Sequence, residues 1–538
     1  MRVPIRKRSA LAVAAALGLV LSAAGAGPAF SASAATSPAP RVLRVGTFNG
    51  IPGTFGTIQQ AVNAARPGDW ILVGPGDYHE SGSSDPTHPA GVLITTPGIY
   101  LRGMDRNKVV VDGTLPGGGT PCAGDAKYQN TGPNGTDGKP TGRSGVEVYK
   151  ASGVWVENLT ACNFLTNSTG AQGNQIWWNG GDGDPTIGMG SYWGDYLTTT
   201  STYSNGVNPP FGDYGIFASK ASGPGVIDHS YASNMGDAGY YIGGCQTNCN
   251  AVVRNAHAQY NALAYSGTDS GGNLVIEHSE FDHNKTGITS DSENNDDAPS
   301  PADGSCPNGA AGPLGGHSCE IWQYNDIHDN NNPNVPGNAT NGLAGAAPIG
   351  TAMVLAGTRN VTQYHNTIAN NGAWGALIVD QPYMGTPPPF AQCQGGVYVV
   401  PGQVCYYQAF GNQVIGNTFR NNGFFGNPTN GDLGLATLPH DPGNCFQQNT
   451  DPKGVTSDPP NLQSFPYNPC GQPNGGDLGP LAAEVLCATQ LLAPCPNLPG
   501  ASYPRATQVV LPPLQPQPSM PNPCAGVPAN PWCPRRSG

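Results

Sequence analysis

Short apolar runs separated by turn residues make up most of the chain. Near its start, apolar side chains at positions 58, 61, 62 and 65 recur with the spacing of one helix face. Four short apolar runs with turn residues between them follow at 70–73, 91–94, 99–103 and 109–113. The pattern predicts one short helix followed by a series of short β-strands.

One longer pattern recurs from residue 154 onward: a β-branched run, then Asn or His, an apolar residue, and a closing Asn three positions later. The seven copies are Val154–Asn167, Val226–Asn234, Val252–Asn261, Leu274–Asn284, Ile321–Asn330, Val361–Asn371 and Val414–Asn422. The residues three before the closing Asn are Phe164, Tyr231, Ala258, Phe281, Ile327, Ile368 and Phe419. Asn261 and Asn284 are 23 residues apart, and Asn330 follows after 46, or two such periods.

A period near 23 residues with three short strands is typical of a parallel β-solenoid. Each coil of a solenoid buries its inward side chains only by stacking on its neighbours, so the repeated apolar positions would form one continuous core. Asn side chains at the same turn of successive coils can hydrogen-bond in a ladder. The opening helix would cover the first sheet edges. We therefore predict an all-β fold.

The stretches Gly56–Glu80 and Gly98–Gly113 carry a more specific pattern. They read TIQQAVNAARPGDWILVGPGDYHE from Thr57 and GIYLRGMDRNKVVVDG from Gly98, and they resemble the N-terminal cap and first coils of secreted right-handed parallel β-helix proteins of the pectin-lyase-like superfamily. The resemblance implies that fold over residues 42–440. It leaves function open, because the superfamily holds lyases, hydrolases, epimerases and adhesins.

The first 34 residues have the features of a secretory signal peptide. A basic start with Arg2, Arg6, Lys7 and Arg8 precedes an apolar stretch of about 12 residues and the small residues 32–34. The apolar stretch is shorter than the roughly 20 residues that span a membrane. We therefore expect a secreted, extracellular protein with a signal peptide at 1–34 and a short N-terminal tail at 35–41.

All 14 cysteines follow this leader, and their even number in an exported chain favours disulfides. Pairing of near neighbours is the simplest expectation: Cys245/Cys249, Cys306/Cys319, Cys393/Cys405, Cys487/Cys495 and Cys524/Cys533. After the solenoid we expect a Cys-rich extension at 441–496, with helical spacing within 478–492 that would cap the C-terminal end. A Pro-rich tail at 497–538, extended or disordered, would follow.

The amino-acid composition of the chain limits the kinds of molecule that it can bind. Gly (77) and Pro (53) are abundant among 538 residues, charged residues are only 11%, and mean hydropathy is -0.32. The net charge of -12 becomes -16 when the leader's four basic residues are removed. Such a chain should be repelled by nucleic acid and anionic lipid. We expect a monomer that neither spans a membrane nor binds nucleic acid.

Three insertions indicate where ligands would bind. They follow the apolar segments 239–244, 287–289 and 376–380, so they should leave the solenoid at the same turn and edge a groove. One insertion supplies Asp291, Glu293, Asp296 and Asp297, whose oxygens could hold Ca²⁺. The alternative is a solvated loop with Asx turns.

Aromatic residues concentrate in a second region. Trp177, Trp178, Tyr192 and Trp193 could stack on sugar rings. The alternative is that these rings pack beneath the loop that carries them.

Catalytic residues are harder to identify. The motifs of pectate lyases, polygalacturonases and mannuronan epimerases are incomplete or absent. The remaining candidates for a base are Lys150, Lys220, Arg254 and Lys285. Lys285 with Asp296 and Asp297 is the best constellation for a lyase, and the alternative is an exposed turn lysine.

Two main functions remain. We expect a secreted β-helix protein that binds polysaccharide in the groove without catalysis. The alternative is a lyase, hydrolase or epimerase acting on acidic glycans in that groove, and a second alternative is a surface adhesin or spacer. The negative charge disfavours an anionic substrate unless Ca²⁺ or a local basic patch intervenes.

Overall fold

The computed structural model describes residues 39–535 except 182, 184–185, 246–247, 293–305, 307–308, 314–316, 338–344, 383–395, 400–403 and 490–500. The expected signal peptide at 1–34 lies outside the described residues. No helix in the described part is long and apolar enough to cross a membrane.

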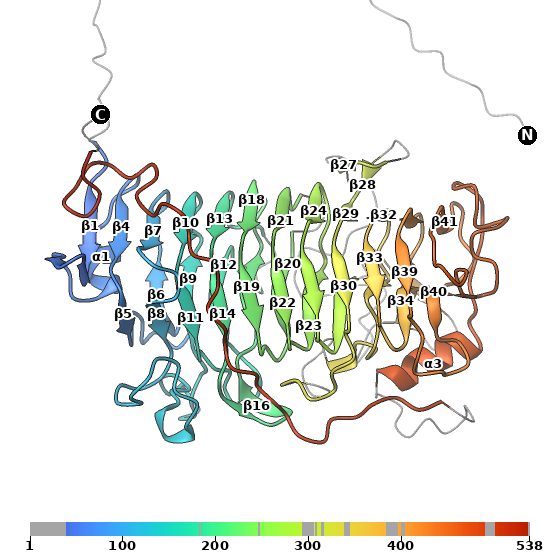
Figure 1. Cartoon of the computed structure of the whole chain (residues 1–538), viewed down its shortest axis with the longest axis horizontal. Coiled ribbons are helices and arrows are strands. Elements are labelled where there is room, and N and C mark those ends of the chain that lie inside the picture. Colours follow the sequence, from blue (N-terminus) through green and yellow to red (C-terminus); the bar gives the residue numbers. More distant parts are fainter. Residues whose placement is uncertain are drawn as a thin grey trace, which may run out of the picture. The chain divides into compact units, whose positions relative to one another are not determined.

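Successive coils stack into three parallel sheets, each coil passing from sheet 1 to sheet 2 to sheet 3 (Figure 1). Sheet 1 consists of β1 (Val42–Val45), β4 (Trp70–Val73), β7 (Tyr100–Gly103), β10 (Val154–Glu157), β13 (Tyr192–Asp195), β18 (Gly225–Asp228), β21 (Ala251–Arg254), β24 (Leu274–Glu277), β29 (Glu320–Gln323), β32 (Val361–Tyr364), β38 (Gln413–Ile415) and β41 (Cys445–Gln447). Sheet 2 consists of β5 (Gly76–Tyr78), β8 (Val109–Asp112), β11 (Thr160–Cys162), β14 (Thr198–Thr200), β19 (Tyr231–Ser233), β22 (His257–Gln259), β25 (Glu280–Asp282), β30 (Asp326–His328), β33 (Thr367–Ala369) and β39 (Thr418–Arg420).

Sheet 3 consists of β6 (Ala90–Ile94), β9 (Ser144–Tyr149), β12 (Ile176–Asn179), β17 (Ile216–Ser219), β20 (Ala238–Gly243), β23 (Leu263–Thr268), β26 (Thr286–Asp291), β31 (Met353–Ala356), β34 (Trp374–Val379), β40 (Gly431–Ala436) and β42 (Ser457–Asp458). The insertions carry a 3-10 turn (Ala126–Tyr128) and small antiparallel sheets of β2 (Thr47–Phe48) with β3 (Ile51–Pro52), β15 (Ser204–Asn205) with β16 (Asn208–Phe211), β27 (Ala310–Ala311) with β28 (His317–Ser318), and β35 (Gln381–Pro382), β36 (Val397–Val399) and β37 (Val404–Tyr407). The fold is the right-handed parallel β-helix predicted from the sequence.

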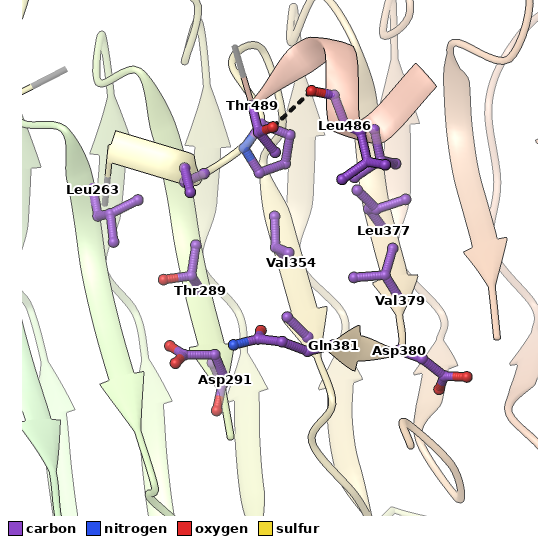
Figure 2. Close-up of a pocket in the computed structure, with 16 residues that line it drawn as sticks. Leu263, Thr289, Asp291, Val354, Leu377, Val379, Asp380, Gln381, Leu486 and Thr489 are labelled. Carbon is purple, nitrogen blue, oxygen red and sulfur yellow. Dashed lines mark hydrogen bonds between the residues drawn. The ribbon is translucent and has the colours of Figure 1, made fainter. Parts of the chain in front are cut away.

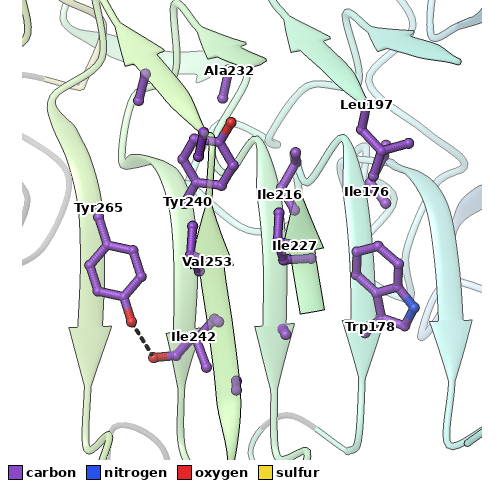
Figure 3. Close-up of a cluster of buried hydrophobic side chains, with 14 of the residues drawn as sticks. Ile176, Trp178, Leu197, Ile216, Ile227, Ala232, Tyr240, Ile242, Val253 and Tyr265 are labelled. Atoms are coloured by element: carbon purple, nitrogen blue, oxygen red, sulfur yellow. Dashed lines mark hydrogen bonds between the residues drawn. The ribbon is translucent and has the colours of Figure 1, made fainter. Parts of the chain in front are cut away.

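The core consists of inward side chains held in register by the parallel pairing. In sheet 2, Phe281, Ile327, Ile368 and Phe419 face one another in successive strands and are fully buried, as the repeat predicts. The second copy of the repeat is displaced by one residue, because Ala232 rather than Tyr231 pairs with Ala258 in that row. Figure 3 shows inward side chains of sheet 3, where Trp178, Ile216, Tyr240 and Tyr265 fill the interior.

Buried Asn side chains join the coils at the turns. Between sheets 1 and 2, the Asn366 side chain accepts the backbone N–H of Asn325 at 3.0 Å and donates to Asn417 Oδ1 at 2.9 Å. Its Nδ2 also donates to the Trp322 carbonyl at 2.8 Å. A second ladder between sheets 2 and 3 runs through Asn261, Asn284, Asn330, Asn371 and Asn422. The predicted Asn ladder is confirmed, and it satisfies backbone groups that would otherwise be buried without partners.

Removing one rung should destabilise the solenoid. Asn366→Ala leaves the Asn325 N–H, the Trp322 carbonyl and one oxygen of Asn417 without this partner in a buried site. We expect the free energy of unfolding to fall by about 2–4 kcal/mol, measured by urea denaturation. The control is Thr367→Ala, an exposed change on the next residue, which should stay within about 0.5 kcal/mol of the parent. Equal stability of the two variants would contradict a stabilising ladder.

Two helices pack against the described coils, but only the first covers an end; the second lies on a flank rather than forming the predicted C-terminal cap. Helix α1 (Ile58–Ala64) buries Ile58, Ala61 and Val62, as its spacing predicted, and Glu80 accepts the N–H of Ile58 at 2.6 Å. Helix α3 (Pro480–Ala488) forms within the expected segment 478–492. It packs on the flank of sheet 3 with Trp374 and Leu377. Strands β41 and β42 continue sheets 1 and 3 after residue 440, so stacking extends past the expected boundary.

Five disulfides join described cysteines. Cys245–Cys249, Cys306–Cys319 and Cys524–Cys533 form as the neighbour rule predicted. Cys122–Cys162 and Cys445–Cys470 join residues 40 and 25 positions apart, which that rule did not anticipate. Cys405 and Cys487 are also disulfide-bonded, whereas Cys393 and Cys495 lie outside the described residues. The disulfides agree with an oxidising compartment.

The C-terminal tail runs back along the coils toward β1 as an extended segment (Figure 1). Tyr503 anchors its start by donating to Glu484 at 2.8 Å, and Trp532 near its end is buried against Phe48, Trp70 and Met104. Proline lacks an N–H, so the tail offers carbonyls that side chains of the coils bind. The carbonyls of Pro512, Pro518 and Pro523 accept from Asn234, Arg106 and Arg102.

Trp532→Ala should release the end of this tail. The indole donates to the Ile51 carbonyl at 2.9 Å and is 4% exposed. Truncating a buried Trp to Ala typically costs about 3–5 kcal/mol, which exceeds the free energy that holds a short segment against the coils. We expect faster proteolytic cleavage within residues 517–533 with the coil core intact. Phe465→Ala, at a ring that is 77% exposed, is the control. Unchanged cleavage would show that Trp532 does not hold the tail.

Candidate functional site

The three insertions leave the same sheet. Strands β20, β26 and β34, which precede them, all belong to sheet 3, as the sequence predicted. Much of each insertion lies outside the described residues, including Glu293, Asp296 and Asp297. The outer face of sheet 3 is therefore the surface that these insertions border.

A hydrogen-bonded group of polar residues lies near the start of this face. We call His88, Glu147, Tyr149, Lys150 and Asn179 the His88 cluster. Glu147 is an outward residue of β9, and its Oε1 accepts from His88 Nδ1 and Asn179 Nδ2, both at 2.8 Å. The His88 ring lies against Tyr149 with 3.9 Å between ring centroids. The cluster combines a carboxylate, an imidazole, an amide and an ammonium group in a few ångströms of sheet surface.

Burial divides the cluster into a hidden and an accessible part. The Glu147 side chain is fully buried, whereas His88 is 23% exposed and Lys150 is exposed. The hydrogen bond to Glu147 raises the pKa of His88 above its ordinary 6.5, against a smaller opposing effect of burial. A carboxylate that orients a histidine in this way is one of the common arrangements for proton transfer.

Two lysines mark the same turn of nearby coils. Lys150 follows β9 and Lys220 follows β17, both in the left-handed backbone region with φ of 49° and 54°. Gly180 holds the equivalent position between them, and a Cβ there would lie 1.9 Å from the Lys220 carbonyl oxygen. The coil between the lysines therefore requires glycine. Lys150 is exposed whereas Lys220 is fully buried, so of the two only Lys150 is accessible to a ligand at this edge of sheet 3.

The four aromatic residues expected to bind sugar do not form one surface. Trp178 and Tyr192 point inward and are fully buried, which removes them from any surface platform. Trp177 lies on the outer face of sheet 3 but is 5% exposed, with its ring stacked on Phe217 at 5.1 Å. Trp193 lies on the outer face of sheet 1 and stacks on Trp155 at 4.5 Å. Trp177, Trp178 and Tyr192 are packed rings, as the alternative expects, but they lie in strands β12 and β13 and not beneath a loop.

A cavity of about 130 Å³ lies farther along the same face. Val354, Leu377 and Val379 form its apolar floor, and Asp291 and Gln381 lie at one end (Figure 2). Asp291 is buried and accepts from Thr268 Oγ1 at 3.2 Å. Of the expected calcium ligands only Asp291 is described, so calcium binding at this insertion stays a prediction.

Lys285 lies apart from Asp291, the described residue at the start of the acidic insertion; Asp296 and Asp297 lie outside the described residues. It precedes the first residue of β26, whereas Asp291 ends that strand, so they lie about 20 Å apart along it. Its side chain is fully buried, and Nζ donates to the Gly345 carbonyl at 2.7 Å. The expected exposed turn lysine is thus a core residue at the opposite edge of sheet 3.

This burial predicts a pH-dependent stability. Burial lowers the pKa of Lys285 from 10.5 to about 7. Between these values the unfolded chain binds the proton and the folded chain does not, so the contribution of Lys285 to stability rises with pH. From pH 7 to 9 we expect the free energy of unfolding of the parent to rise by about 1 kcal/mol per pH unit relative to that of Lys285→Met.

Urea denaturation at pH 6, 7, 8 and 9 measures this difference. Below pH 7 this difference should not change with pH, because Lys285 is then protonated in both the folded and the unfolded chain. Lys139→Met, an exposed change, should give no slope over the whole range. A flat difference for Lys285→Met between pH 7 and 9 would mean that the amine titrates normally.

The sequence alone did not indicate His88 or Glu147. They are 59 residues apart, and no motif links them. One signal was present: Glu147 is an acidic residue within the apolar run Val146–Val148. A charged residue there must face outward from a buried strand, which places it on the surface of sheet 3.

Comparisons with known proteins bear on the fold. No family model matches the chain, and no curated protein matches its sequence. Among solved structures, the A-module of the mannuronan C-5 epimerase AlgE4 from Azotobacter vinelandii is 15% identical with a TM-score of 0.40, covering 74% of this chain and 88% of that one. A rhamnogalacturonan lyase is 10% identical with a TM-score of 0.41, covering 70% and 82%. An endo-xylogalacturonan hydrolase from Aspergillus tubingensis is 9% identical with a TM-score of 0.33, covering 72% and 79%.

Identities this low concern the fold alone. The three stacked parallel sheets of the chain itself define its architecture. The chain has a parallel β-helix fold.

Proposed function

We propose that the protein binds an acidic extracellular polysaccharide on the outer face of sheet 3, at the His88 cluster. The observation that carries this proposal is the buried Glu147 holding His88 beside the exposed Lys150. Lys150 offers a compact positive charge for a sugar carboxylate. Tyr149 and His88 offer ring surface next to hydrogen-bonding groups, the mixture that sugar sites use.

The net charge of -12 disfavours an anionic ligand, but the charged groups exposed at the His88 cluster differ from those of the whole chain. Glu147 is buried and already accepts two hydrogen bonds, so the groups accessible to a ligand here are His88 and Lys150. An anionic polymer repelled by the remainder of the surface would find its favourable contact at this edge. Binding should therefore weaken as ionic strength rises.

Removing the positive charge should weaken binding. We expect Lys150→Ala to lower the affinity for a polyuronate by about tenfold, the loss of one charge-assisted contact of about 1.4 kcal/mol. Isothermal titration calorimetry of the mature protein with polygalacturonate, polymannuronate and a neutral glucan measures this.

The matched control is Lys108→Ala, an exposed lysine that pairs with Asp105 away from sheet 3. This control should bind like the parent. Equal losses in both variants would indicate nonspecific attraction to lysine charge, and tighter binding of the neutral glucan would exclude an acidic ligand.

The His88–Glu147 pair also favours a second candidate, β-elimination of a uronate polymer. Neutral His88 would take the proton at C5, the C4–O bond would break to leave a C4–C5 double bond, and the leaving oxygen would take a proton. Lys150 would offset the charge that develops on the carboxylate. Ultraviolet absorbance of the unsaturated product distinguishes this from binding alone. A signal in the parent that His88→Gln abolishes supports elimination, and no signal with retained binding excludes it.

A further inference from the structure

A second cluster of ionisable residues covers the outer face of sheet 2, away from sheet 3. Three neighbouring strands, β22, β25 and β30, carry it in strict register. The first outward row holds His257, Glu280 and Asp326, and the second row holds Gln259, Asp282 and His328. The turn residues that follow on the latter two strands are His283 and Asp329. Three imidazoles and four carboxylates thus alternate over three coils.

The centre of this group is Asp282. Its Oδ1 lies 2.6 Å from His257 Nε2, and its Oδ2 is hydrogen-bonded to His283 Nδ1. The nearest ligand atoms of His257, Glu280 and Asp282 all lie within 4.8 Å of one another. Parallel pairing fixes the backbone of all three, so their side chains need only small rotations to point at one common centre.

The one fixed cation that acts on this group in the described part of the chain is Arg420, which lies near Asp326. In the described part of the chain, ion pairs to Glu280, Asp282 and Asp329 come from histidines alone. With neutral histidines these carboxylates form a concentration of negative charge on a rigid surface. A bound cation would relieve the repulsion among them.

In two other groups of similar composition, fixed donors of the protein already hold one carboxylate. Asp228, in the group with Asp195 and His229, accepts from Arg254 Nε at 2.7 Å and from Asn255 Nδ2 at 2.8 Å. Asp112, in the group with Asp77 and His79, accepts backbone N–H groups at both oxygens. Only the group on β22 and β25 combines imidazole and carboxylate ligands without such partners among the described residues.

We propose that His257, Glu280 and Asp282 bind a divalent transition-metal ion such as Zn²⁺ on the outer face of sheet 2. Imidazole nitrogen with carboxylate oxygen suits Zn²⁺, whereas Ca²⁺ and Mg²⁺ prefer oxygen ligands alone. The ion takes the place of the proton between His257 Nε2 and Asp282, and the neutral imidazole then carries its proton at Nδ1. His283, bonded to the other oxygen of Asp282, orients this carboxylate as an outer partner.

The site is reachable from solvent. The His257 and His283 side chains are 30% and 49% exposed. The C-terminal tail binds Asn107 and Asn158 on one side of sheet 2 and Asn234 and Asn334 on the other. None of these hydrogen bonds involves β22, β25 or the residues of the site. Because the ligands come from two coils, the ion would join these coils in addition to the Asn ladder.

Isothermal titration of chelator-treated mature protein with Zn²⁺ tests the proposal. We expect one saturable site per chain and a rise in Tm on loading, since an ion that binds only the folded state stabilises it. Asp282→Asn and His257→Asn should each lower the affinity at least tenfold. His365→Asn is the matched control, because this exposed histidine lies outside the cluster and should leave the affinity unchanged.

Several results would overturn the proposal. These are no saturable Zn²⁺ binding up to millimolar concentration, equal loss in the control, or saturation by Ca²⁺ but not Zn²⁺. Glu280→Gln provides a check on folding, because its side chain is 50% exposed and its loss should spare the metal-free Tm. A normal metal-free Tm with parent-like Zn²⁺ affinity in this variant and in Asp282→Asn would also exclude the site.

Discussion

The stacking of coils in strict register is the constraint on which every surface of this protein depends. Parallel pairing places the same position of successive coils about 4.8 Å apart, and buried amides such as Asn366 bond each turn to the next. A side chain therefore has its closest outward neighbours in the coils on either side. Chemistry on this scaffold arises where residues distant in sequence share a row, as His257 and Glu280 do in sheet 2.

The same spacing works against aromatic sugar platforms. Outward rings in one row are close enough to stack on each other, and Trp155 and Trp193 do so with planes 10° apart. Trp177 stacks on Phe217 in the same way. Rings that stack along a row expose their edges rather than their faces to a ligand. The Trp and Tyr residues that are concentrated in the sequence therefore do not form a sugar-binding surface. Charged and polar side chains, which gain nothing by stacking, remain available to bind.

The sequence was informative wherever local periodicity decides the outcome. The 23-residue step from Asn261 to Asn284 predicts a rung of the ladder, and the bond between them exists. Side-chain direction was less predictable, because a shift of one residue turns a strand residue from the core to the surface. Trp177 and Trp178 show this, one outside and one inside. The sequence could not predict that His88 contacts Glu147, because the length of the insertion between their coils does not follow the repeat period.

The tail shows how a solenoid can bind its own C-terminus without adding a strand. A segment poor in N–H donors cannot extend a sheet, so it does not compete with the pairing of the coils. It is held instead through its carbonyls by Arg102, Arg106 and Asn234, and Arg106 also bonds Thr198 and the His229 carbonyl. Arg106 and Asn234 lie at turns that flank sheet 2, and Arg102 lies on β7 of sheet 1. None of these hydrogen bonds involves an outward residue of sheet 3, the surface that we propose for an extended polymer.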